Sequence, residues 1–92
     1  MRFDWDDNKS EKLKRERGMT FDEAVLVFFD GARVIVPKSE NPEQSLAIGF
    51  AQDRLITLVH EYREDEEGDL TWLVTYWKAT KEEAKEYEKA RR

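Results

Sequence analysis

Four runs of alternating or continuous apolar residues lie between residues 32 and 77, each bounded by turn residues. Their content of β-branched and aromatic residues is typical of strands, and they read ARVIVP, SLAIGF, RLITLVHEYR and DLTWLVTYW. AQD joins the second run to the third and EDEEG joins the third to the fourth, and both connections predict hairpins. The polar stretch KSENPEQ predicts a loop, and Pro37 is expected to end the strand before it.

The remaining segments predict one short strand and several helices. A short apolar run, RFDW, predicts a brief N-terminal strand, and a polar helix then ends at Gly18, where glycine tolerates a positive φ. Thr20 with Glu23, and Thr80 with Glu83, match the capping box that opens a helix. The helix after Thr20 presents apolar residues at helical spacing, namely Phe21, Ala24, Val25 and Phe28.

The order of elements is therefore β-α-α-β-β-β-β-α, which predicts the α+β class. We expect an antiparallel sheet of four main strands plus the short N-terminal strand, with two N-terminal helices and one C-terminal helix. Strict alternation in the last strand would place its residues on two faces. One face would carry Leu70, Trp72, Val74 and Tyr76, and the other Thr71, Leu73, Thr75 and Trp77. Both faces carry large apolar groups, so we expect at least part of each to be covered.

Composition narrows the class of protein. A chain of 92 residues with 39% hydrophobic content predicts one domain over residues 1–92 with a compact core. The chain has no cysteine and no apolar run long enough to span a membrane, which predicts a soluble intracellular domain without disulfides. The net charge of −5 argues against a general polyanion binder, although each end of the chain carries six cations.

Chemically competent side chains fall near the ends of the predicted strands. Cleavage of RNA without a metal needs a base, a group that stabilises phosphate charge, and an acid. His60 or Glu43 would suit the base, and Arg63, Lys78 or Lys9 the cations. Structural interpretations stay open for each, since a lone strand histidine commonly belongs to the core and an arginine beside an acidic turn commonly forms an ion pair.

Trp77 has two interpretations as well. A tryptophan at the end of a strand can stack on a nucleobase or be buried in a core or interface. One histidine among scattered carboxylates does not form a metal-ligand pattern, and the isolated glycines do not form a phosphate-binding loop. We therefore expect no metal and no cofactor.

The chain resembles the BrnT toxins (DUF497) of BrnT/BrnA type II toxin–antitoxin modules. The resemblance follows the order and spacing of short pieces over nearly the whole chain, FDWDDNKSEKLKRERGMTFDEAVLVF, AIGF, RLITLVHEYR and KATKEEAKEYE. It implies a RelE-like fold, a ribonuclease that halts translation in the cytoplasm, and neutralisation by a cognate BrnA-like antitoxin. It also implies RNA as the substrate.

Carried over by position, the resemblance implies catalytic roles for four residues, His60, Arg63, Glu43 and Lys9. Arg17 replaces a histidine that the family usually places before its helix-ending glycine, here Gly18. The last strand of the family typically ends Ser-Ala-Arg, and Trp77 stands where that arginine would be. We expect Lys78, Trp77 and Arg17 to contact RNA.

The missing strand-end arginine leaves two functions open. One is an RNA-cleaving toxin whose site has been rebuilt around Arg63, Lys78 and Lys9. The alternative is a catalytically weak or inactive BrnT-like module that binds its antitoxin, which the excess of acids in the middle of the chain favours.

Overall fold

The computed structural model describes residues 2–91. Its elements in chain order are β1 (Phe3–Asp4), α1 (Asp7–Arg17), α2 (Phe21–Ala24), the 3₁₀ helix η1 (Val25–Phe29), β2 (Val34–Lys38), β3 (Asn41–Ala51), β4 (Arg54–Asp65), β5 (Gly68–Lys78) and α3 (Lys81–Ala90). The predicted α+β class and the order of elements are confirmed. No helix within residues 2–91 combines the length and the apolar character needed to cross a bilayer.

The sheet has five strands in the order β1-β5-β4-β3-β2. The four main strands pair antiparallel, as expected from their hairpin connections. β1 instead lies parallel to β5, with Phe3 beside Thr71, so the sheet is mixed rather than purely antiparallel. Only a hairpin forces neighbouring strands to run in opposite directions, and β1 reaches the sheet without one.

The predicted loop KSENPEQ is wrong, because only Ser39 and Glu40 form the turn and β3 already begins at Asn41. Pro37 does not end β2, which continues to Lys38 through a shift of register. The two departures have different physical reasons. β2 is the edge strand, where a proline costs no ladder hydrogen bond on the outer side, and exposed strand ends tolerate polar residues.

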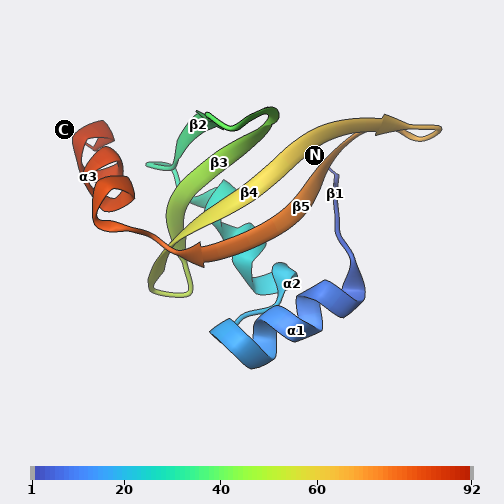
Figure 1. The fold of residues 1–92 in the computed structure, drawn as a ribbon, viewed down its shortest axis with the longest axis horizontal. Coiled ribbons are helices and arrows are strands. Elements are labelled where there is room, and N and C mark those ends of the chain that lie inside the picture. Colours follow the sequence, from blue (N-terminus) through green and yellow to red (C-terminus); the bar gives the residue numbers. More distant parts are fainter. Residues whose placement is uncertain (1, 92) are drawn as a thin grey trace.

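The core lies between the sheet and the N-terminal helices, which Figure 1 shows on one side of it. Buried apolar residues from both layers form this core, namely Leu13, Met19, Phe21, Ala24, Val27, Phe28, Ala47, Ala51, Ile56, Leu58, Leu73 and Tyr76. Phe3 and Trp5 pack against its margin from the N-terminal strand region.

The predicted single helix over Phe21–Phe28 is an α-helical turn followed by the tighter η1. Thr20 and Glu23 form the expected capping box. η1 consists of the residues VLVFF, whose branched and aromatic side chains are weak α-helix formers, and its winding turns Val27 into the core. Val27 packs closely on β3, since a Cβ atom added to Gly49 would lie 3.2 Å from it.

A bulge in β5 changes the two faces predicted for this strand. Thr75 pairs with Val59 and Leu73 with His60, which leaves Val74 without a partner on β4. Strict alternation therefore fails after Leu73, because the extra residue reverses the side on which the following residues lie. Tyr76 consequently joins Leu73 on the helical side, while Trp77 faces the other way with its partner Thr57.

Tyr76 connects the strand to the helices. Its hydroxyl accepts a hydrogen bond from the backbone N–H of Met19 at 2.9 Å and donates one to the Met19 carbonyl at 2.8 Å. Met19 follows Gly18, whose φ of 95° ends α1 as the sequence predicted. Tyr76 is only 1% exposed, so these hydrogen bonds form without competition from water.

α3 is held to the sheet by two carboxylates. Glu83 completes the predicted capping box with Thr80 and also accepts hydrogen bonds from the Thr57 hydroxyl and the Trp77 indole N–H, at 2.8 and 3.0 Å. Farther along the helix, the Tyr87 hydroxyl donates to Asp30 at 2.7 Å.

Replacing Tyr76 with phenylalanine removes both hydrogen bonds and leaves the buried N–H and C=O of Met19 without this partner. We expect Tyr76→Phe to lower the free energy of unfolding by about 1–3 kcal/mol. Urea denaturation followed by circular dichroism measures the change. Tyr62→Phe is the matched control, because Tyr62 is 67% exposed. An equal loss in the two variants would contradict this role of Tyr76.

Candidate functional site

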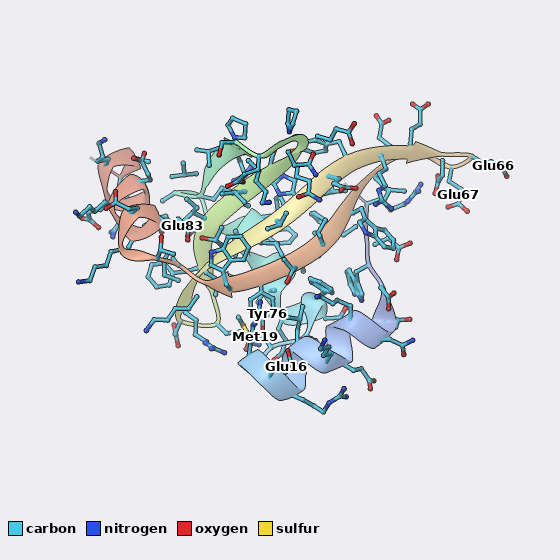
Figure 2. The ribbon with its side chains drawn as sticks, viewed as in Figure 1. Glu16, Met19, Glu66, Glu67, Tyr76 and Glu83 are labelled. Atoms are coloured by element: carbon cyan, nitrogen blue, oxygen red, sulfur yellow. The ribbon has the colours of Figure 1, made fainter. Side chains whose placement is uncertain are left out.

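The predicted site residues separate into two groups along β5. His60 and Arg63 lie on β4 beside the first half of β5, whereas Trp77 and Lys78 end the strand. Arg63 pairs with Leu70, seven residues before Trp77, which corresponds to about 23 Å along an extended strand. Figure 2 shows the same separation between Glu66 and Glu67 at the hairpin tip and Glu83 at the start of α3.

His60 is fully buried on the helical side of the sheet. Its ring packs edge-on against Phe28 and Tyr62, with centroid distances of 5.0 and 5.3 Å. Neither ring nitrogen has a hydrogen-bond partner within the described chain, and burial lowers the pKa of the imidazole below its ordinary value of 6.5. A general base must come within hydrogen-bond reach of the proton it removes. In this conformation His60 is enclosed by the core and lacks that access.

Arg63 lies on the opposite face from His60, because the two residues are an odd number of positions apart on a strand. Its guanidinium donates two hydrogen bonds to Glu61, at 2.9 and 2.7 Å, and lies 4.5 Å from the centre of the Trp72 ring. The Gln44 amide and Arg63 together lower the pKa of Glu61. Arg63 therefore forms the ion pair that was its structural alternative, while remaining about half exposed.

Glu43 and Lys9 make no hydrogen bond or ion pair with His60 or Arg63 within residues 2–91. Glu43 is exposed near the start of β3, and Lys9 is half-buried in the first turn of α1. The structure thus does not join the four predicted catalytic residues through direct contacts.

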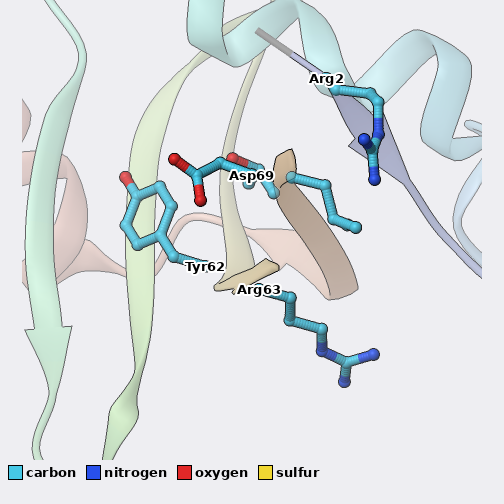
Figure 3. Close-up of a pocket in the computed structure, with 6 residues that line it drawn as sticks. Arg2, Tyr62, Arg63 and Asp69 are labelled. Atoms are coloured by element: carbon cyan, nitrogen blue, oxygen red, sulfur yellow. The ribbon is translucent and has the colours of Figure 1, made fainter. Parts of the chain in front are cut away.

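A pocket of about 380 Å³ lies near the hairpin tip, lined by Arg2, Tyr62, Arg63, Asp69, Leu70 and Thr71. Figure 3 shows Tyr62 and Asp69 on one side of the strand pair and Arg63 pointing away from them. Arg2 is neutralised by Asp65 at 2.5 Å. The tip adds several more acids, and their repulsion makes this pocket a poor site for phosphate.

Cations gather instead where β5 ends. The guanidinium of Arg17 donates to the carbonyl oxygen of Tyr76. Arg54 packs against Gly18, since a Cβ atom added there would lie 2.8 Å from its guanidinium. Arg54 and Lys78 both line a second pocket, of about 440 Å³, together with Asp53, Leu55, Ile56, Ala79 and Ala84. We call Arg17, Arg54 and Lys78 the cation cluster.

Arg54 is absent from the residues that the sequence singled out, although a signal for it exists. It follows Gln52 and Asp53, whose positive φ values of 49° and 65° form the tight turn between β3 and β4. In an antiparallel sheet this turn lies at the same end as the last residues of β5. The predicted hairpins therefore already imply that Arg54 and Lys78 are neighbours.

Trp77 also lies at this end. It carries no charge that could replace a cation, and its indole is not exposed for stacking on a base. It is half-buried, and its indole N–H is bound to Glu83. The bulge at Val74 places Trp77 on the face of the sheet away from the N-terminal helices. Trp77 thus anchors α3 beside the cation cluster.

Comparison with known families gives one match that spans most of the chain. Residues 5–83 match the model of a family described as "Ribonuclease toxin, BrnT, of type II toxin-antitoxin system". A search of curated proteins gave no match.

Burial of His60 predicts how stability depends on pH. In the folded state the pKa of His60 is lowered, so the unfolded chain binds more protons once the pH falls below about 6.5. The stability of the parent should therefore fall by up to about 2 kcal/mol from pH 7 to pH 5 through this residue. Urea denaturation of the parent and of His60→Leu at both pH values measures it. An equally steep pH dependence in His60→Leu would contradict the assignment.

Proposed function

Because the chain belongs to the BrnT family of ribonuclease toxins of type II toxin–antitoxin systems, we propose that it binds RNA at the cation cluster and cleaves it in the cytoplasm. A toxin of this type has an antitoxin as its partner, and we propose that this partner is BrnA-like. The whole chain would form one BrnT-like domain with a RelE-like fold.

The convergence of Arg17, Arg54 and Lys78 at one end of the sheet supports this site. These side chains come from three separate segments, namely the end of α1, the start of β4 and the end of β5. RNA carries one negative charge per phosphate, and cations that displace its counterions provide most of the sequence-independent affinity. The chain as a whole is acidic, so this local cation cluster would determine where RNA is held.

The same pocket contains a carboxylate that can serve the chemistry. Asp53 lies next to Arg54 in the lining and would accept the proton of a 2′-hydroxyl. Arg54 and Lys78 would stabilise the charge that develops on the attacked phosphate, without a metal, and the departing 5′-oxygen would take its proton from Lys78 or from water. The roles first predicted for His60, Arg63, Glu43 and Lys9 stay predictions, and they place catalysis at the other end of β5.

A second function, a module that binds its antitoxin but cleaves RNA weakly, is favoured by the state of Trp77. The family usually has an arginine at this position, and such a charge stabiliser is worth about 10²–10³ in rate. Here the position holds an indole bonded to Glu83, which supplies no charge to a phosphate. Growth arrest and RNA integrity after expression of the chain alone separate the two functions.

The double variant Arg54→Gln with Lys78→Gln tests the proposed site. We expect RNA binding to weaken, and the slope of log affinity against log salt to fall by about 0.7 for each phosphate that the variant no longer neutralises. Fluorescence anisotropy with a labelled single-stranded RNA, titrated at several salt concentrations, measures both quantities.

Arg63→Gln is the matched control, because it removes an exposed arginine at the far end of β5. We expect this variant to bind RNA as the parent does. Parent-like binding by the double variant, or loss of binding in Arg63→Gln alone, would contradict the proposed site. Cleavage assays on the same three proteins show at which end of β5 the catalysis occurs.

A further inference from the structure

We propose that an apolar patch on η1 and the adjoining edge strand is the surface on which the antitoxin docks a basic amphipathic segment. The patch consists of Leu26, Phe29 and Ile35. This inference rests on the antitoxin partner named above and adds where that partner binds and by which chemistry. It does not depend on whether the chain cleaves RNA.

The sequence of η1 is apolar on all sides. Its five residues are VLVFF, and a helix with this character is normally buried all round. Here Val27 and Phe28 enter the core, but Leu26 is 41% exposed and Phe29 is 73% exposed. Residues three apart in a 3₁₀ helix eclipse each other, so Leu26 and Phe29 lie on the same side. One side of this helix therefore lacks a cover within the described chain.

The patch continues onto the edge of the sheet. A tight turn, in which the Arg33 N–H donates to the Asp30 carbonyl at 3.1 Å, leads from η1 directly into β2. Ile35 on β2 pairs with the buried Ala47 and is itself 43% exposed. No strand within residues 2–91 pairs with the outer side of β2. An extended or helical segment lying here would cover apolar side chains next to a free strand edge.

Charge identifies the kind of occupant. Residues 19–77, which contain the whole patch, carry twelve acids and only four cations. Beside the patch, Asp22 lies one helical turn before Leu26, is exposed, and has no ion pair within the described residues. The exposed Arg33, between Phe29 and Ile35, donates to the Asp30 carbonyl. A partner with basic residues flanking its apolar anchors would be attracted to this surface. RNA would be repelled, and a second copy of the chain would bring the same net charge of −5.

The substitution Phe29→Glu tests the patch, since the side chain is mostly solvent-exposed and the fold should tolerate the change. The probe is the protein encoded by the reading frame next to this gene, and isothermal titration calorimetry measures its Kd. We expect Phe29→Glu to weaken binding by at least about thirtyfold, as for the loss of a central aromatic anchor. The melting temperature should stay close to that of the parent.

Tyr62→Ser is the matched control, because Tyr62 is a similarly exposed aromatic residue at 67% and lies on β4 outside the patch. It should leave the Kd unchanged. In growth assays, Phe29→Glu should keep whatever toxicity the parent has but lose rescue by the co-expressed probe. If the parent neither cleaves RNA nor arrests growth, the proposed function is wrong. The calorimetric result still tests the docking surface on its own.

Three results would overturn the inference. The first is a parent that does not bind the probe, and the second is parent-like binding by Phe29→Glu. The third is a parent dimer, seen by light scattering, that Phe29→Glu dissociates without changing the Kd for the probe. That result would assign the patch to a second copy of the chain.

Discussion

The unpaired residue Val74 in β5 is the constraint on which the arrangement of the rest depends. A single extra residue reverses the facing of the strand, so that Leu73 and Tyr76 both enter the core beneath the helices. Tyr76 can then bind both backbone groups of Met19 and fix the junction between α1 and α2. The same reversal sends Trp77 to the other face, toward Glu83. The N-terminal helices and α3 are thus positioned from one short stretch of strand.

The carboxylates of Glu83 and Asp30 hold α3 in place, and α3 forms one side of the pocket next to the cation cluster. Glu83 accepts from Thr57, Trp77 and the Thr80 backbone, and these hydrogen bonds lower its pKa although burial opposes them. The ionised Glu83 therefore stabilises the fold through these hydrogen bonds and is not available to a substrate. α3 begins beside Lys78 and places Ala84 in the pocket that Arg54 and Lys78 share. Because Glu83 is engaged by hydrogen bonds inside the fold, Arg54 and Lys78 are left facing the pocket.

Much of this fold could be predicted from local sequence signals. Capping boxes at Thr20 and Thr80, the glycine that ends α1 and the two hairpins are short-range features, and each is confirmed. The bulge at Val74 and the early start of β3 could not, because both depend on pairing with residues far along the chain. The candidate site divides in the same way: the burial of His60 is a tertiary property, whereas the Arg63–Glu61 ion pair joins residues two apart on β4, the local alternative that the acidic surroundings of Arg63 had predicted.

Two surfaces with different chemistry follow from this arrangement: a cationic end of the sheet, where we propose that RNA binds, and an apolar margin, where we propose that the antitoxin docks. Titration of the ¹⁵N-labelled protein with a short single-stranded RNA, followed by NMR, tests whether RNA is held where β5 ends. If RNA binds there, the amide signals of residues 17–19, 52–54 and 77–79 and the indole N–H of Trp77 shift, while those of residues 62–71 stay in place. Shifts confined to residues 62–71 would contradict this binding site.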